Sequence, residues 1–291
     1  MQKMPVCYLC QKNNIKIAFL KLGYKIFKCS DCGFHWLDFD YSYDQFAKNY
    51  YQEGYFKGDK DFRAYANYED DKKIIQKNTQ NYLNKILHIK KIGTLLDIGC
   101  ALGFFLEICQ TKGFETFGID ISEYAVKNAK KIIPNVVLGN ISNSSFKKNF
   151  FDVITMFDLI EHLNDPRKDL LKVRSLLKDD GLLLIQTGDS GSVFAKILNK
   201  RLHFFAPPQH LFFFNQKNIS EILKQSGFQV IKIEKDGKWV SLRYLLHMMG
   251  YSLNNGLWDK LYDLTNKNFL GKIPLYFRFN DNIVVYAKKS F

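Results

Sequence analysis

From residue 93 onward, short apolar runs alternate with segments whose apolar positions recur at helical spacing. The apolar runs predict strands over 94–98, 115–119, 136–138, 151–157, 182–187, 228–234 and 282–288. The segments between them predict helices, some with a recognisable first residue: Ser122 and Asp165 are cap residues, and Asn215 or Ser220 opens a later helix. This alternation predicts an α/β fold built on a parallel sheet.

The chain upstream of this alternation has two further parts, so we expect three parts in all. Residues 1–40 are punctuated by cysteines, and strand patterns at 15–19 and 24–28 predict a hairpin. Residues 41–92 are rich in tyrosine and phenylalanine and end in a helical pattern, which predicts a connector or cap. Residues 93–291 form the main domain, with inserts expected at 188–214 and, as helical turns, at 236–280.

Composition narrows the class of protein. The 291 residues are 46% hydrophobic and 15% aromatic, which argues for a folded core. No apolar run reaches the length of a membrane span and the first residues lack a secretory h-region, so we expect a cytoplasmic protein. The net charge of +13 is compatible with nucleic-acid contact, but the chain has no dense basic block. An abundance of lysine, asparagine and isoleucine throughout explains the charge equally well.

Four cysteines near the N-terminus have the spacing of a metal site. Cys7 and Cys10, and then Cys29 and Cys32, form two C-x2-C pairs separated by eighteen residues. Two-residue spacing lets both thiolates of a pair reach one tetrahedral ion, so the pattern predicts a structural four-cysteine Zn²⁺ site. Four unrelated thiols, or two disulfides in a secreted protein, are the alternatives, and we expect His35 to be a bystander.

A glycine-containing turn is the most informative motif. The strand at 94–98 runs through Asp97 into Gly99 and Gly103, and the next strand ends at Asp120. Glycines let the backbone approach a ligand closely, and an acid at the second strand end can accept hydrogen bonds from ribose hydroxyls. The phosphate fingerprint G-x-G-x-x-G and a P-loop lysine are both missing here. The turn therefore predicts a nucleoside ligand without phosphate, and S-adenosylmethionine (SAM) is the obvious candidate.

Candidate acceptor-site residues lie directly after the fourth strand and within the 188–214 insert. Asp158, Glu161 and His162 come directly after the strand at 151–157, at the sheet edge where ligands bind. His162 can reach a substrate proton, or Glu161 and His162 can simply brace the loop. His210 follows the stiff segment 206–209, which can cover a pocket, and packing in that loop is its alternative role.

Taken together, these motifs resemble the class I SAM-dependent methyltransferases, and most closely bacterial small-molecule and sugar-type members with an N-terminal zinc ribbon. The resemblance runs through most of the chain. It is carried by the ribbon cysteines and by the segments 50–56, 95–103 with Asp120, 161–163, 176–183, 209–214 and 223–228.

The resemblance implies a Rossmann-like, seven-stranded sheet with helices on both faces and an antiparallel last strand. It places Gly99 and Gly103 against the methionine moiety of SAM, Asp120 at the ribose, Asn140 near adenine, and Phe157 and Asp158 beside the sulfonium. The full expected cofactor-binding set is Asp97, Gly99, Cys100, Gly103, Asp120, Ile121, Asn140, Ile141, Phe157 and Asp158.

Ala101 departs from the family pattern, which has glycine at this position most often. Alanine fits there if its φ stays negative, so we expect SAM binding to survive.

Three functional hypotheses follow from the sequence. The first is a SAM-dependent methyltransferase acting on a small-molecule acceptor, sugar-containing ones included, with His162 and His210 as candidate general bases. The second is an RNA methyltransferase that grips phosphate through the ribbon and its basic surface. The third is a non-catalytic zinc-ribbon protein on a degenerate SAM fold, and the joint presence of Asp97, Gly99, Gly103 and Asp120 argues against it.

Overall fold

A seven-stranded mixed sheet forms the centre of the protein. The computed structural model describes residues 6–39, 43–58, 68–253, 256–266 and 268–290. The strands are β4 (Gly93–Ile98), β5 (Phe114–Asp120), β6 (Val136–Leu138), β7 (Phe151–Phe157), β8 (Leu177–Gly188), β10 (Phe228–Ser241) and β11 (Pro274–Lys289). Their order is β10-β11-β8-β7-β4-β5-β6, and only β11 runs antiparallel to its neighbours β8 and β10. The predicted α/β fold with seven strands and an antiparallel last strand is confirmed.

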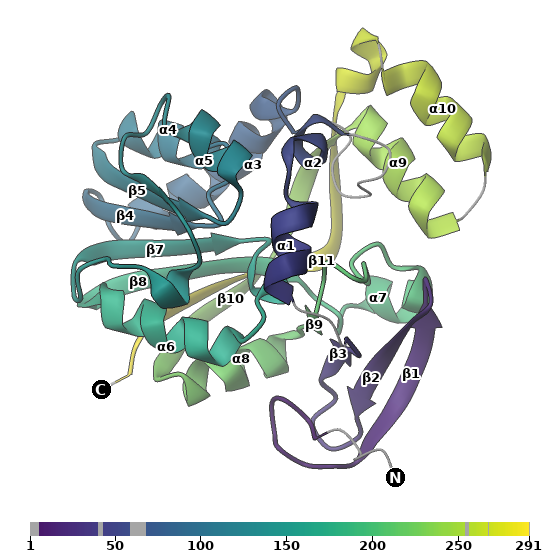
Figure 1. Ribbon diagram of the computed structural model, residues 1–291, viewed down its shortest axis with the longest axis horizontal. Helices are drawn as coiled ribbons and strands as arrows, with labels where there is room; N and C mark the ends of the chain where they lie inside the picture. The colour runs from purple at the N-terminus through teal and green to yellow at the C-terminus, as the bar shows by residue number, and fades with distance from the viewer. Residues whose placement is uncertain (1–5, 40–42, 59–67, 254–255, 267, 291) are drawn as a thin grey trace.

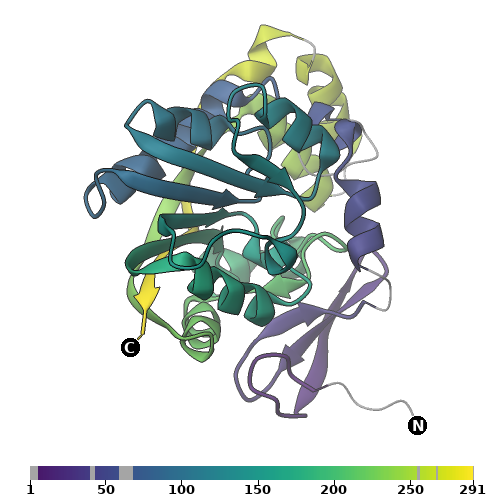
Figure 2. The ribbon, with the colours of Figure 1, turned by 60° about the vertical axis from the view of Figure 1, so that its left-hand side comes forward.

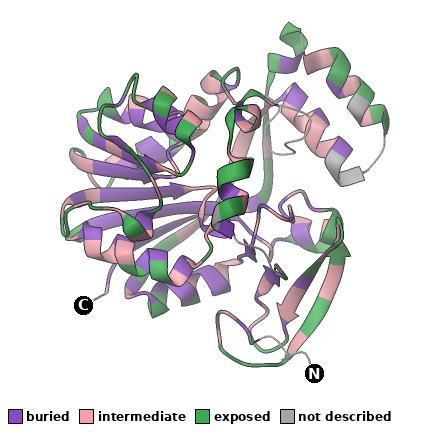
Figure 3. Cartoon of the chain, in the orientation of Figure 1, coloured by how far each residue is buried: buried purple, intermediate pink, exposed green. Residues whose placement is uncertain are grey.

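Helices cover both faces of this sheet (Figures 1 and 2). One face carries α3 (Lys72–Leu87), α4 (Phe104–Gln110) and α5 (Glu123–Ala129), and the other carries α6 (Pro166–Leu176) and α8 (Gln216–Gln225). Successive residues of a strand point to opposite faces, so Leu95 packs with the first group and Leu96 with the second. Both are fully buried, and the central strands are buried nearly throughout (Figure 3).

The helix starts follow the sequence signals. The side chains of Ser122 and Asp165 accept hydrogen bonds from the backbone N–H groups of Ala125 and Lys168, respectively. Asn215 accepts one from the N–H of Asn218, so α8 begins there rather than at Ser220. These side chains satisfy N–H groups that the first helical turn leaves unpaired.

The cysteine-rich N-terminal part forms a second sheet, and the main domain contributes one strand to it. Its strands are β1 (Ile15–Lys21), β2 (Tyr24–Cys29), β3 (His35–Leu37) and β9 (Phe212–Phe213), in the order β1-β2-β3-β9. The first three lie at one end of the molecule beside α1 (Tyr43–Tyr50) (Figure 2). Phe34 stacks on Phe212 with ring centroids 5.9 Å apart, so the two parts share one hydrophobic core. We call residues 6–39 the ribbon.

The region 236–280 differs from the expected series of helical turns. Strands β10 and β11 continue beyond 234 and before 282 as a paired arm, which carries α9 (Leu242–Leu253), α10 (Gly256–Asn266) and the 3-10 turn η4 (Phe269–Lys272). The arm residues mix polar and aromatic side chains, pair only with each other and are mostly exposed or half-buried, so their sequence carries no buried-strand signal.

The remaining elements are α2 (Glu53–Lys57), α7 (Val193–Leu198) and the 3-10 turns η1 (Ile141–Asn143), η2 (Ile160–His162) and η3 (Asn199–Arg201). Within the described part of the chain, no helix combines the length and the apolar character needed to cross a membrane.

Candidate active site and cysteine cluster

A cavity of about 920 Å³ opens at the carboxyl ends of β4, β5 and β7. It extends from the glycine turn after β4 to the arm formed by β10 and β11. Its lining includes Gly99, Asp120 and Asn140, which define what we call the glycine-turn end, and also His162 and His210. The cavity therefore has room for two molecules side by side, one at each group of residues.

The glycine turn corrects one expectation. Ala101 has φ of +47°, so the expectation that its φ stays negative is wrong. The turn is fixed by Asp120, whose carboxylate accepts the backbone N–H of Ala101 at 2.8 Å and that of Ser122 at 2.9 Å. A left-handed alanine costs about 1–2 kcal/mol, and these charge-assisted hydrogen bonds offset that cost. Backbone strain of this kind is frequent where a ligand is bound.

The structure brings most of the expected cofactor residues together. Nine of the ten line the cavity: Asp97, Gly99, Cys100, Asp120, Ile121, Asn140, Ile141, Phe157 and Asp158. Gly103 does not, because it lies at the start of α4 with φ of +78°, where a Cβ would be 3.3 Å from that of Ala129. Glycine at 103 is thus explained by backbone conformation and helix packing. The roles of all ten toward a cofactor stay predictions.

Two carboxyl groups at the glycine-turn end, the buried Asp97 and the partly buried Asp120, form no ion pair with a lysine or arginine among the residues that the structure describes. Asp97 accepts a hydrogen bond from the Thr155 hydroxyl at 2.7 Å, and burial raises its pKa to about 7. Burial also raises the pKa of Asp120, although backbone N–H groups partly counteract it. A cationic ligand group beside Asp97 would restore its charge, because an opposite charge favours the ionised carboxylate.

Asp158 links this end of the cavity to the arm. Its φ is +46°, uncommon for a residue other than glycine. One carboxylate oxygen pairs with Nζ of Lys238 at 2.8 Å, and the other accepts from the Gln186 amide at 3.0 Å. Burial alone would raise the pKa of Asp158, but Lys238 and Gln186 outweigh it and lower the pKa.

The two candidate bases meet at the far end of the cavity. The imidazoles of His162 and His210 form a T-shaped contact with centroids 4.5 Å apart. Nδ1 of His162 lies 3.0 Å from the carbonyl oxygen of Gln209, and Nδ1 of His210 lies 2.7 Å from that of Phe204. Burial lowers the pKa of His162 to about 4 and that of His210 well below its usual value. Both rings are therefore neutral at pH 7.

Glu161 lies beside these histidines and is only 1% exposed. Its carboxylate accepts the Thr187 hydroxyl at 2.9 Å, and burial together with the nearby charge of Asp158 raises its pKa to about 8. Its backbone carbonyl accepts the N–H of Leu211 at 2.8 Å, which ties the segment after β7 to the loop containing His210.

The tyrosine-rich segment covers the same end. Tyr51 and Tyr55 line the cavity, and the Tyr51 hydroxyl lies 3.1 Å from Nδ1 of His162. Tyr50 instead receives a hydrogen bond from the Gln209 side chain. Residues 41–42 and 59–67 of the expected connector lie outside the described residues.

Sequence reasoning missed the residues that reach the cavity from the arm. Lys238 pairs with a carboxylate 80 positions earlier in the chain, and Tyr244 on α9 lines the cavity. Neither belongs to a motif, because their position depends on how β10 and β11 fold back over the sheet. His203, from the 188–214 insert, also lines the cavity and was not singled out.

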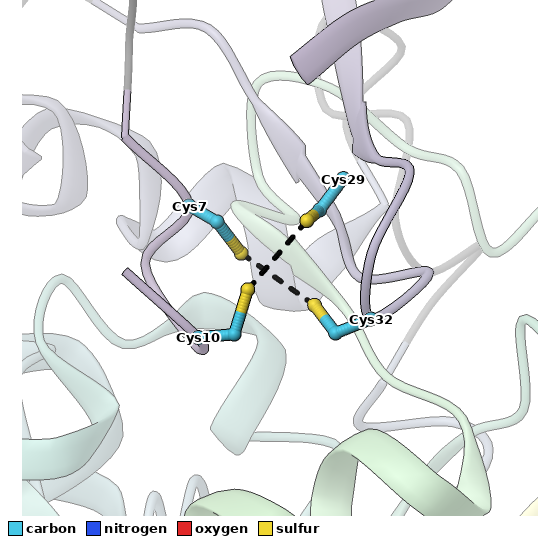
Figure 4. Close-up of side chains that lie close together, drawn as sticks. All are labelled: Cys7, Cys10, Cys29 and Cys32. Atoms are coloured by element: carbon cyan, nitrogen blue, oxygen red, sulfur yellow. Dashed lines mark hydrogen bonds between the residues drawn. The ribbon is translucent and has the colours of Figure 1, made fainter. Parts of the chain in front are cut away.

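The four N-terminal cysteines converge on one point (Figure 4). The Sγ atoms of Cys7 and Cys32, and those of Cys10 and Cys29, are 3.6 Å apart, and all four thiols are free. A disulfide would bring two sulfur atoms to about 2.05 Å. Tetrahedral bonds of about 2.3 Å from one ion place its thiolates about 3.8 Å apart, so this cluster can hold a metal ion.

Known proteins match the main domain. The family described as a methyltransferase domain matches residues 68–233. Protein MJ1123 of Methanocaldococcus jannaschii is 28% identical over 174 residues, which cover 60% of this chain and 82% of that protein. The ubiquinone biosynthesis O-methyltransferase of Nitrosomonas europaea is 27% identical over 116 residues, 37% of this chain and 48% of that enzyme. The chain therefore spans about half the length of that relative.

Two solved structures share the fold. A SAM-dependent methyltransferase from Archaeoglobus fulgidus is 23% identical, with a TM-score of 0.54, and the match covers 81% of this chain and 99% of that one. Magnesium protoporphyrin IX methyltransferase from Synechocystis PCC 6803, solved with bound S-adenosylhomocysteine, is 14% identical with a TM-score of 0.54, covering 84% and 99%.

Proposed function

The chain belongs to the methyltransferase domain family, and from this premise we propose that it transfers the methyl group of SAM to a small-molecule acceptor. The observation that carries the proposal is the single cavity described above. It is lined at one end by the glycine turn and Asp120, and at the other by His162, His210 and Tyr51. Donor and acceptor would therefore meet in one cavity.

The glycine-turn end supplies the chemistry that SAM requires. Asp97 is a buried carboxyl without a cationic partner among the described residues, which suits the ammonium group of the methionine moiety. Each oxygen of Asp120 accepts one backbone N–H and keeps a second lone pair for a ribose hydroxyl. Gly99 and Cys100 would contact the methionine moiety, Asn140 and Ile141 the adenine. Phe157 and Asp158 would flank the sulfonium.

The reaction is an in-line displacement at the methyl carbon. The acceptor atom forms a bond to that carbon while the carbon–sulfur bond breaks and S-adenosylhomocysteine leaves. Holding the two molecules in line, with reacting atoms about 3–3.5 Å apart, supplies much of the acceleration. A hydroxyl or amine acceptor also loses a proton, and the neutral His162 and His210 are the candidate bases. We call the part of the cavity that they line the acceptor end.

We further propose that the cysteine cluster binds Zn²⁺. Four thiolates at the observed separations suit a closed tetrahedral site, and such sites stabilise folds rather than catalyse reactions. Elemental analysis of freshly purified, reduced protein should find one zinc per chain at this site. Its absence would contradict the assignment.

Calorimetric titration tests the donor site. Asp120→Ala removes a charged acceptor for two hydroxyls, and hydrogen bonds to charged groups contribute about 1.5–3 kcal/mol each, so SAM should bind at least about 100-fold more weakly. Asp152→Ala is the matched control, because Asp152 also accepts a backbone N–H, from Thr94, but does not line the cavity. Wild-type protein that fails to bind SAM would overturn the proposal.

The acceptor class is tested with labelled SAM. The purified protein is incubated with cell extract separated into RNA, protein and small-molecule fractions. Label should enter the small-molecule fraction. Label in RNA would contradict the proposed acceptor class and favour the RNA alternative.

A further inference from the structure

The acceptor end of the cavity contains a cluster with the composition of a metal site. Glu161, His162 and His210 each offer one ligand atom, and these atoms lie within 4.8 Å of one another. The cluster is separate from the ribbon cysteines and contains no sulfur. Two imidazoles and one carboxylate are the ligand set that binds divalent transition metals while leaving coordination positions open.

The hydrogen bonds of both histidines leave the other ring nitrogen available as a ligand. Nδ1 of His162 faces the carbonyl oxygen of Gln209, and Nδ1 of His210 faces that of Phe204. A carbonyl oxygen only accepts, so these two contacts require the tautomer with the proton on Nδ1, in which Nε2 presents its lone pair. The Tyr51 hydroxyl, 3.1 Å from Nδ1 of His162, then accepts from the same N–H. Metal-binding histidines characteristically donate their second nitrogen to a carbonyl or carboxylate in this way, which fixes tautomer and orientation.

Glu161 completes the set. Its carboxylate is buried and accepts one hydrogen bond, from Thr187. Among the residues that the structure describes, no lysine or arginine forms an ion pair with it. A carboxylate buried without a cation is costly, and a bound divalent ion would supply the missing charge.

The backbone holds the three ligands in a fixed arrangement. Glu161 and His162 belong to η2, directly after β7, whereas His210 lies in the loop before β9. The N–H of Leu211 donates to the carbonyl of Glu161, and the His162 ring donates to the carbonyl of Gln209. Two segments far apart in sequence are thus joined on both sides of the cluster, so the ligands are positioned before any ion arrives.

We propose that Glu161, His162 and His210 bind a divalent transition-metal cation whose open positions receive an oxygen of the methyl acceptor. The second half of this proposal rests on the proposed function, but ion binding itself does not.

The cation would promote methyl transfer to oxygen. A hydroxyl bound to a divalent ion loses its proton far more readily than a free one, and that proton passes to solvent water. An electron pair of the metal-bound oxygen then forms the bond to the methyl carbon while the carbon–sulfur bond breaks. The electron pair of the broken bond stays on sulfur and neutralises the sulfonium. Hydroxyl compound and SAM give methyl ether, S-adenosylhomocysteine and one proton. This assigns an oxygen nucleophile to the acceptor.

Manganese distinguishes this site from the ribbon. Thiolates select soft or borderline ions, whereas Mn²⁺ is the weakest competitor in the divalent series. A full-length chain already loaded with zinc at the ribbon therefore retains it when Mn²⁺ is added. Free Mn²⁺ has a strong paramagnetic resonance signal that decreases as the ion binds, so a titration counts sites directly.

The decisive experiment is this Mn²⁺ titration of wild type and three variants. Wild type should bind one Mn²⁺ per chain. His210→Asn keeps a side-chain N–H for the Phe204 carbonyl but removes Nε2, and Glu161→Gln keeps an acceptor for Thr187 but removes the charge. Each should weaken Mn²⁺ binding at least about 100-fold, since even supporting residues around a metal contribute 10–100-fold. His203 lines the same cavity but lies outside the cluster, so His203→Asn should leave the affinity for Mn²⁺ unchanged.

The outcomes separate this inference from the proposed function. Wild type that holds one zinc per chain, binds SAM and takes up no Mn²⁺ overturns the metal site and leaves methyl transfer standing. Wild type that binds Mn²⁺ but not SAM overturns the proposed methyl transfer and leaves the metal site standing. Equal Mn²⁺ affinity in all variants also overturns the assignment, and retained SAM affinity in the variants shows that they are folded.

Discussion

Adding one methyl group at Gly188 should disturb the acceptor end of the cavity. Gly188 ends β8, and a Cβ built there would lie 2.3 Å from Cδ2 and 2.4 Å from Cε2 of Phe204. Favourable carbon–carbon contacts are about 3.5–4.0 Å, so in Gly188→Ala the ring must retreat by about 1 Å. The ring has little room, because Phe204 is 6% exposed and lies against Phe213 with centroids 5.9 Å apart.

The expected loss of stability follows from this overpacking. Forcing extra volume into a packed core costs about 1–3 kcal/mol. At about 1.6 °C per kcal/mol for a protein of this size, the Tm should fall by about 2–5 °C. Differential scanning calorimetry measures this change. Gly256→Ala is the control, since no described atom lies within 4 Å of a Cβ at that position.

A double-mutant cycle identifies the clash as the cause. Phe204→Leu removes the ring atoms that the new methyl group of Gly188→Ala would meet. Gly188→Ala should therefore lower stability less in the Phe204→Leu background than in the wild type. The Phe204 carbonyl also accepts the hydrogen bond from His210, so Gly188→Ala should weaken Mn²⁺ binding at the proposed site as well. An unchanged Tm, or strictly additive effects in the cycle, would refute this reasoning.

Three further predictions follow from buried charges and the cysteine cluster. Asp71→Asn should lower the free energy of unfolding by about 3 kcal/mol in chemical denaturation, because it leaves the buried guanidinium of Arg243 without its 2.7 Å partner. Asp70→Asn should cost less than about 1 kcal/mol, since the Asp70 side chain is 41% exposed; equal effects would contradict the argument. The pKa of Asp97 is raised to about 7 by burial, so in the free protein its contribution to stability is fully present below its unfolded pKa of 3.8 and is lost as pH rises through 7. Asp97→Asn does not titrate, so its Tm relative to wild type should rise between pH 4 and pH 8, and a constant difference would refute this. Cys29→Ser should remove zinc from the purified protein and lower its Tm, measured by elemental analysis and calorimetry, whereas retained zinc would count against a four-thiolate site.

The parts of the fold that the sequence predicted well are those whose burial leaves a local pattern. Strands β6 and β7 match the predicted ranges 136–138 and 151–157, and β7 is apolar on both faces because helices cover it on both sides. The arm beyond residue 234 escaped prediction because Lys235 and Asp236 are polar and pair only with the returning strand. Pairing between distant segments leaves no periodic signal in either one.

In the site, too, residues fixed by local sequence were predicted, whereas those placed by contacts between distant segments were not. Gly99 and Asp120 were found because a turn and a strand end impose residue types locally. Ala101 was misjudged, since its left-handed conformation depends on a hydrogen bond to Asp120, 19 positions later. His162 and His210 were each singled out from sequence, but their contact with each other could not be, because their segments meet only in the folded chain.

The sheet order β1-β2-β3-β9 means that the ribbon cannot be treated as a detachable module. The N–H of Leu37 donates to the carbonyl of Leu211, one residue after His210. Truncating the chain to its main domain would leave β9 as an unpaired edge and expose Phe212 and Phe213, both buried in the intact protein. The ribbon and the loop that contains His210 should therefore melt as one cooperative unit. Removing the metal proposed for the ribbon should loosen this loop, although the loop supplies none of the four cysteines.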